Sequence, residues 1–135
     1  MSSGHPIVIV DARNVMRSRW PNFSEERFLE LIRAWADAEG AHLVAVFDGR
    51  APGGGAGSHE IDERTTIVGT GGGSADDWIA EHAPELARVA GRLWLVSSDG
   101  ELRARVGDHA ERAIGGGSFA TQLEALDRDR GGSRD

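Results

Sequence analysis

The sequence predicts one α/β domain in which helices cover both faces of a mainly parallel sheet of about five strands. Two observations predict this fold class. Short runs of apolar residues alternate with segments that have helical periodicity. The elements follow one another in the order βαβ-β-αβαβα, which is typical of an open three-layer α/β fold.

The expected strands are the apolar runs at residues 7–10, 43–47, 65–69 and 93–97, with a weaker run at 110–114. The runs at 7–10, 43–47 and 93–97 are apolar throughout rather than alternating. Continuous apolar runs of this length are typical of parallel strands, because helices cover both faces of such a sheet.

The clearest helix begins after Ser24, which can cap it, and ends before Gly40. Phe28, Leu31 and Trp35 recur between these two residues at the spacing of one helix face. Further helices are expected from residue 74 onward, where a serine and an aspartate form a capping box, and over 101–106 and 118–126.

The domain is expected to span residues 1–126, followed by a disordered tail over 127–135 that is rich in charged residues and glycine. Residues 51–62 are expected to form a flexible loop, because glycine dominates their first half. A length of 135 residues leaves room for a single hydrophobic core.

Composition excludes several classes of function. The chain has no cysteine, and all 15 of its basic residues are arginine. Thiolate metal sites, P-loops and Schiff-base chemistry are therefore absent, since they need cysteine or lysine. A net charge of −7 argues against a non-specific nucleic-acid coat. Without a signal peptide or an apolar stretch that could cross a membrane, we expect a cytoplasmic protein.

Three of the expected strands stop at an aspartate, namely Asp11, Asp48 and Asp99. In open parallel sheets, ligands bind outside the carboxyl ends of the strands. Asp76 and Asp77 follow the third strand at the start of the next helix. The topology therefore predicts that four segments bring carboxylates to one edge of the sheet.

Carboxylates that lie close together repel each other unless a cation lies between them. An all-oxygen site without cysteine favours Mg²⁺ or Mn²⁺ over Zn²⁺. Water bound to such an ion becomes more acidic and can attack a phosphodiester bond. The sequence therefore predicts a metal-dependent centre built from Asp11, Asp48, Asp76 and Asp99, with Asp77 in a supporting position.

Each of these aspartates has a purely structural alternative. An aspartate after a strand is often a turn or cap residue. Carboxylates in the first turn of a helix are also stabilised by the helix dipole. Asp76 is the preferred ligand because Asp77 occupies the capping-box position, but the two roles can be exchanged.

The segments IVIVDARNV, AVFDG, GSADDWIAEHA and LVSSDGELR resemble those of the NYN-domain group of PIN-like nucleases, and most of all the YacP-like ribonucleases. The likeness runs from residue 7 to about residue 126. Family positions match Asp11, Asn14, Asp48, Asp76 and Asp99. The resemblance implies a PIN-like, Rossmann-like α/β/α fold and Mg²⁺- or Mn²⁺-dependent endoribonuclease activity.

The chain departs from the family in two places. The family's first motif commonly reads D-G-Y-N, whereas here the second and third positions are Ala12 and Arg13. The segment before Ser118 is padded with glycine and matches only weakly. Asn14 is a candidate hydrogen-bond partner for a metal ligand or a phosphate, with a turn or helix cap as its structural alternative.

The expected partner is RNA, in single-stranded form, while participation of the ribosome or of another protein stays open. Arg13, Arg17 and Arg50 follow the first two aspartates, and arginine forks suit phosphate groups. Two other functions compete with the nuclease. One is a catalytically silent NYN-type module that binds RNA or protein. The other is a phosphotransfer or phosphatase domain with an aspartyl nucleophile.

Overall fold

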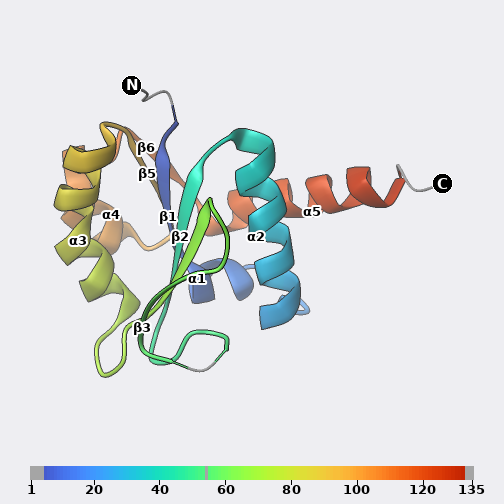
Figure 1. Cartoon of the computed structure of the whole chain (residues 1–135), viewed down its shortest axis with the longest axis horizontal. Coiled ribbons are helices and arrows are strands. Elements are labelled where there is room, and N and C mark those ends of the chain that lie inside the picture. The colour runs from blue at the N-terminus through green and yellow to red at the C-terminus, as the bar shows by residue number, and fades with distance from the viewer. Residues whose placement is uncertain (1–4, 54, 133–135) are drawn as a thin grey trace.

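The computed structural model describes residues 5–53 and 55–132 of the chain, whose full length is 135 residues. A six-stranded sheet with the order β3-β4-β2-β1-β5-β6 forms its centre (Figure 1). The sheet is parallel except for β3, which pairs with β4 in the antiparallel sense. The strands are β1 (Ile7–Asp11), β2 (His42–Phe47), β3 (Gly57–Glu60), β4 (Thr65–Gly69), β5 (Leu93–Val96) and β6 (Arg112–Ile114).

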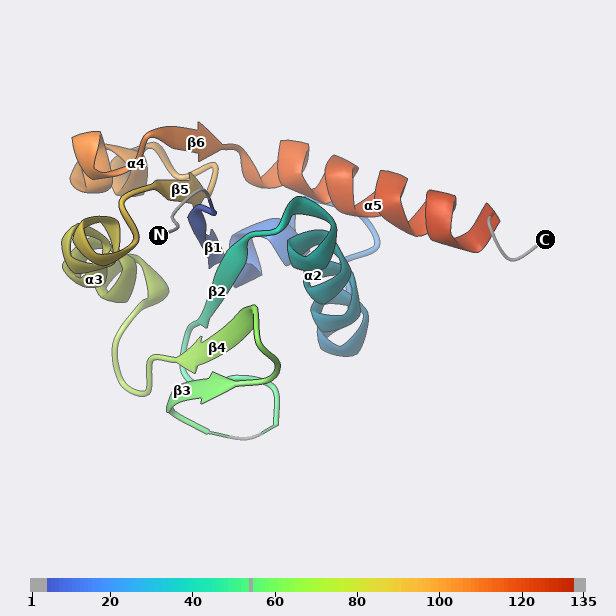
Figure 2. The same ribbon diagram turned by 45° about the horizontal axis from the view of Figure 1, so that its top comes forward.

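Helices cover the two faces of this sheet (Figure 2). The helices are α1 (Ala12–Met16), α2 (Glu25–Glu39), α3 (Ala75–Ala90), α4 (Gly100–Val106) and α5 (Gly116–Gly132), with a 3₁₀ turn η1 (Gly107–His109) after α4. α3 and α4 lie on one face, whereas α1, α2 and α5 lie on the other. The three-layer α/β/α fold expected from the sequence is confirmed.

Successive residues of β1 supply both hydrophobic cores. Val8 and Val10 pack under α1, α2 and α5, while Ile9 packs under α3 and α4. All three side chains are fully buried. This explains why the central strands are continuously apolar, because each face of the sheet requires its own set of buried side chains.

The boundaries of α2 follow from its capping residues. Ser24 Oγ accepts a hydrogen bond of 3.1 Å from the Arg27 N–H, and Gly40 ends the helix at a φ of 66°. Gly40 is suited to this conformation because it has no Cβ to clash in the left-handed region. The helix therefore begins and ends where the sequence predicts.

The structure corrects the expected loop over residues 51–62. Within the predicted loop, β3 forms an antiparallel edge strand, so residues 57–60 are not irregular. α5 begins two residues before the expected cap, Ser118, and continues to Gly132. Residues 127–132 of the expected tail lie in α5, while 133–135 lie outside the described residues. In the described ranges, no helix is long and apolar enough to span a bilayer.

Candidate active site

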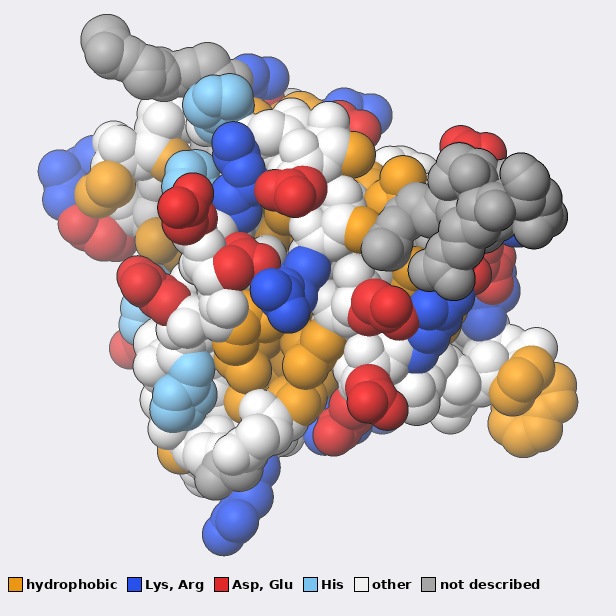
Figure 3. All heavy atoms as spheres, turned by 45° about the vertical axis from the view of Figure 1, so that its right-hand side comes forward, with side chains coloured by type: hydrophobic (Ala, Val, Ile, Leu, Met, Phe, Trp, Pro, Cys, Tyr) orange, Lys and Arg blue, Asp and Glu red, His pale blue; other side chains and the backbone are white. Residues whose placement is uncertain are grey.

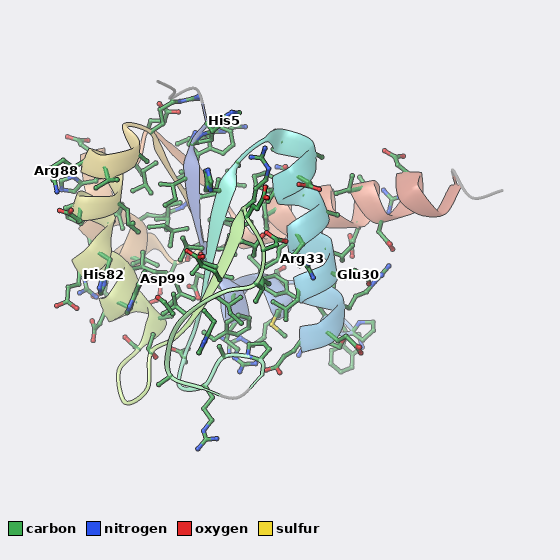
Figure 4. The ribbon with its side chains drawn as sticks, in the orientation of Figure 1. His5, Glu30, Arg33, His82, Arg88 and Asp99 are labelled. Atoms are coloured by element: carbon green, nitrogen blue, oxygen red, sulfur yellow. The ribbon has the colours of Figure 1, made fainter. Side chains whose placement is uncertain are left out.

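The sheet brings the predicted aspartates to one edge. β1 lies between β2 and β5 and is parallel to both, so the carboxyl ends of these strands meet. Asp11 is the last residue of β1, Asp48 directly follows β2, and Asp99 lies shortly beyond β5. Asp76 comes from the first turn of α3. Figure 4 shows Asp99 next to this helix.

Asp11 is the most deeply buried of these carboxylates, with a relative exposure of 7%. Burial raises its pKa from 3.8 to about 6, and the negative charges of Asp76 and Asp48 add to this effect. The Ser97 hydroxyl donates a hydrogen bond of 3.2 Å to Asp11 Oδ2, which lowers the pKa only in part. The charged form of Asp11 is therefore poorly neutralised by the protein itself.

Asp76 interacts with the other three aspartates. Burial raises its pKa, and the charge of Asp99 and a side-chain hydrogen bond with it raise the pKa further. Asp48 acts in the same direction, whereas the positive charge of Arg105 lowers the pKa. Asp76 thus interacts electrostatically with Asp11, Asp48 and Asp99, and the four side chains form one acidic centre.

Asp48 and Asp99 are held by backbone N–H groups at the start of helices. Asp48 Oδ1 accepts a hydrogen bond of 2.5 Å from the Ala75 N–H, in the first turn of α3. Asp99 caps α4, because its Oδ1 accepts from the N–H groups of Glu101 and Leu102 at 2.9 and 3.2 Å. The cap role that the sequence left open for Asp99 is therefore present alongside its place in the acidic centre.

Asp77 points away from this centre. Its carboxylate forms an ion pair of 3.0 Å with Arg105 Nη1 and is 71% exposed. Its N–H donates to Ser74 Oγ at 3.0 Å, as the predicted capping box requires. Adjacent residues in the sequence therefore have different environments, with Asp76 toward the acidic centre and Asp77 toward α4.

Two polar residues join the strand ends to each other. Ser97 is fully buried, and its hydroxyl both donates to Asp11 and accepts from the Asp99 N–H at 3.1 Å. Asn14 Oδ1 accepts the N–H of Ser98 at 3.0 Å. Ser97 was not predicted from the sequence, where the only signal is its place between an apolar strand and Asp99. Asn14 fixes the loop that carries Asp99.

The three arginines expected to bind RNA differ in their surroundings. Arg13 forms an ion pair of 3.1 Å with Glu25, and its guanidinium lies 5.4 Å from the centroid of the Phe47 ring. Arg17 and Arg50 are exposed. Arg105 was not singled out from the sequence, although its charge acts on Asp76.

The donor set fits a hard divalent cation, because every group in the acidic centre offers carboxylate oxygen. The raised pKa of Asp11 fits the same interpretation, since a nearby cation would stabilise its charged form. Within residues 5–53 and 55–132, no three carboxylate or histidine side chains are already arranged around one point.

The sheet order and the acidic centre at its carboxyl edge define a PIN-like α/β domain. Residues 8–130 match the YacP-like NYN domain family. The chain belongs to this family, and the resemblance found in the sequence is confirmed. Membership supports a nuclease role. A comparison with curated proteins found no match.

Solved structures share the fold. Rae1 (YacP) from Bacillus subtilis has a TM-score of 0.67 and 20% sequence identity, with 91% of this chain and 76% of that chain covered. The 5′-exonuclease of T5 with bound zinc has a TM-score of 0.55 at 15% identity, covering 81% and 55% of the two chains. A flap endonuclease of bacteriophage T5, complexed with DNA and metal ions, has a TM-score of 0.54 at 14% identity with the same coverage.

Proposed function

We propose that this protein is a metal-dependent endoribonuclease that hydrolyses phosphodiester bonds of single-stranded RNA. The observation that carries the proposal is the acidic centre, in which burial and the charges of neighbouring carboxylates raise the pKa values of Asp11 and Asp76. Family membership and the solved nucleases with the same fold support the same class of activity.

In this proposal, Asp11, Asp48, Asp76 and Asp99 hold Mg²⁺ or Mn²⁺. The ion supplies an acidified water as nucleophile and stabilises the negative charge that develops on the phosphate. The bound metal ions in the T5 structures support the use of a divalent cation. The choice of RNA rests on the resemblance to YacP-like ribonucleases.

The remaining residues of the edge position this set. Ser97 holds Asp11 and the backbone of Asp99 in a fixed relation, because one hydroxyl contacts both. Asn14 holds the adjacent loop through the Ser98 N–H. Asp77 acts through Arg105, which it keeps close to the acidic centre.

Arg13, Arg17 and Arg50 are proposed to contact the RNA backbone. Arg17 and Arg50 are exposed and can reach a bound strand without breaking an internal contact shown for them. Arg13 is engaged by Glu25, so we expect a smaller contribution from it.

The test is cleavage of a fluorescent single-stranded RNA by wild-type protein with Mn²⁺ or Mg²⁺, with EDTA as the metal-free reference. Asp11→Asn and Asp99→Asn should each abolish cleavage. Asparagine is nearly isosteric with aspartate and is a good helix cap, so both variants should fold. Thermal unfolding checks this.

Asp108→Asn is the matched control, because Asp108 is exposed in η1 and outside the acidic centre. It removes the same charge and should leave cleavage unchanged. Undiminished cleavage by both Asp11→Asn and Asp99→Asn would refute the mechanism. Retention of RNA without cleavage under any divalent metal would instead identify a silent binding module.

A further inference from the structure

A second polar site surrounds Gly115, between β6 and α5. A Cβ built on Gly115 would lie 3.5 Å from Ser98 Oγ, 3.9 Å from Ser118 Oγ and 4.0 Å from Arg103 Nη2. These groups come from the loop after β5, from α5 and from α4. We name Ser98, Arg103, Gly115 and Ser118 the Gly115 cradle, because two hydroxyls and one guanidinium face the same small space.

Arg103 is the principal component of the cradle. In the described part of the chain, its buried Nε has no hydrogen-bond partner, and no ion pair engages its guanidinium. Its neighbour in the same helix, Arg105, is paired with Asp77. Burying part of a guanidinium without an acceptor costs free energy. The chain has a net charge of −7, so acidic side chains are plentiful, yet no described one pairs with Arg103. The unused donors of Arg103 therefore point to an anionic ligand.

The two hydroxyls complete a set of donors. Ser98 Oγ accepts the N–H of Gly116 at 2.8 Å, which leaves its own proton free to be donated. No hydrogen bond of the Ser118 hydroxyl is found within the described ranges. The Asp99 carboxylate, next in sequence to Ser98, is turned toward the N–H groups of α4. A ligand rich in acceptor oxygens, such as phosphate, matches this arrangement.

The cradle is connected to the acidic centre. Ser98 directly precedes Asp99, and the Ser98 N–H is bound by Asn14, three residues after Asp11. The close packing here requires glycine at position 116, where a Cβ would lie 2.3 Å from Asn14 Oδ1. The distance between the cradle and the aspartates is thus fixed by short backbone segments.

We infer that the Gly115 cradle binds a backbone phosphate of the substrate strand, next to the phosphate that is cut at the acidic centre. This inference rests on the proposed function. It explains how a strongly acidic protein holds a polyanion: the repulsive aspartates face the cleaved bond, and a separate cationic group holds the neighbouring phosphate.

Two variants of the whole protein test the cradle. Arg103→Gln removes the guanidinium. Gly115→Ala fills the space by ordinary van der Waals contact, and its backbone is not in the left-handed region, so the variant should fold. Each should raise KM for Mn²⁺-dependent cleavage of single-stranded RNA about tenfold, with kcat changed less than about twofold, because Arg103→Gln removes the charge-assisted hydrogen bond and Gly115→Ala occupies the space that the phosphate would fill.

Binding of the same RNA in EDTA, measured by fluorescence anisotropy, should weaken by a similar factor. The salt dependence of log Kd should become shallower by about one phosphate contact for Arg103→Gln. An RNA with a 5′-hydroxyl should behave as one with a 5′-phosphate does, because the inferred ligand is an internal phosphate. A defect seen only with the 5′-phosphate would overturn this assignment.

Matched controls come from the same chain. Gly117→Ala adds a methyl group close to Arg19, outside the cradle, and makes only ordinary contacts. Arg88→Gln removes an arginine that is paired with Glu85 near the last turn of α3, away from Asp99 (Figure 4). Both should leave KM and Kd close to wild type.

The outcomes separate this inference from the proposed function. If wild-type protein cuts RNA and both cradle variants keep wild-type KM and Kd, the cradle is refuted and the nuclease stands. If wild-type protein binds RNA without cutting it, and the variants bind more weakly, the nuclease fails and the phosphate site stands. Absence of both cleavage and binding would overturn the two together.

Discussion

Asp11 and Asp62 show how differently this fold treats two carboxylates. Asp62, in the turn between β3 and β4, receives Arg33 Nε at 2.8 Å and the N–H groups of Arg64 and Thr65 at 2.8 and 2.9 Å. Burial acts to raise its pKa, but these donors outweigh burial and lower it. At Asp11, burial and the charges of Asp76 and Asp48 outweigh the hydrogen bonds from Ser97 and the Asn14 backbone, and the pKa rises to about 6. Negative charge is therefore neutralised at a structural turn and concentrated at the sheet edge.

The surface around α2 resembles the surroundings of Asp62, because several of its charges are paired. In Figure 3, acidic and basic side chains are interspersed on this face. An open groove here of about 510 Å³ is lined by Glu26, Leu29, Glu30, Arg33, Ala34, Asp37 and Asp62. Several of these charges are paired, as in Arg27–Glu30 and Arg33–Asp62. A concave shape alone does not identify the reactive region, because the distinguishing feature is charge without a partner.

We expect the largest effect on the cleavage rate from substitution of Asp76, and a much smaller one from substitution of Asp77. Asp76→Asn should lower the rate of Mn²⁺-dependent RNA cleavage at least about 100-fold, because it removes a carboxylate of the acidic centre. Asp77→Asn should lower the rate by less than about threefold, because it loses only a largely exposed ion pair with Arg105. Initial rates at saturating Mn²⁺ measure both. The reverse order of effects would place Asp77 in the reactive centre.

Asp11→Asn should make the metal-free protein more stable at neutral pH. The folded-state pKa of Asp11 is raised, so the native protein binds more protons than the unfolded chain and wild-type stability falls as pH rises from 3.8 to about 6. Removing the charge should add up to about 3 kcal/mol to the free energy of unfolding at pH 7.5. Below pH 3.8 this gain should vanish.

Urea unfolding of wild type and Asp11→Asn at both pH values, with EDTA present, measures the difference. Asp108→Asn serves as the control for loss of one negative charge. A gain that persists below pH 3.8 would show that the carboxylate's titration is not its source.

Mn²⁺ should stabilise the wild-type protein at neutral pH. An ion present at about 100 times its Kd adds about 2.7 kcal/mol to the free energy of unfolding. The gain should shrink at pH 5, because the proton on Asp11 competes with the ion below a pKa of about 6. Thermal scans with increasing Mn²⁺ measure this, and an equal gain in Asp11→Asn would place the ion elsewhere.

The smallest expected effect is at Asp62. Asp62→Asn should lower the free energy of unfolding by about 0.5–1 kcal/mol at pH 7, since its ion pair with Arg33 is largely solvated. The pKa of Asp62 is lowered, so this contribution is present above pH 3.8 and is lost as pH falls below that value. Urea unfolding at pH 7 and pH 3 tests the sign, which is opposite to that at Asp11.

Much of the fold follows from local signals. The apolar runs predicted β1, β2, β4 and β5, and capping residues such as Ser24 and Gly40 predicted the ends of α2. β3 was missed because its four residues are all exposed and carry no apolar pattern. Only antiparallel pairing with β4 makes it a strand. Its existence depends on tertiary structure, which a local pattern does not encode.

The candidate sites also depend partly on local sequence signals and partly on tertiary contacts. The aspartates could be predicted to meet because strand ends share an edge in a parallel sheet. Ser97 and Arg103 were not predicted, because the contacts that set them apart join segments distant in sequence. Trp20, a large aromatic residue, is 90% exposed. Burial of a single aromatic depends on whether the fold supplies a partner surface.

The hydrogen bond from the Ala75 N–H to Asp48 Oδ1 offers a way to detect ligand binding at the acidic centre. Any ligand that draws Asp48 Oδ1 inward removes the acceptor of that N–H, whose partner lies 27 residues away in sequence. Solvent exchange of the Ala75 proton would then accelerate while the rest of α3 keeps its protection. A single resonance in an NMR spectrum would thus indicate whether the acidic centre is filled, without any assay of turnover.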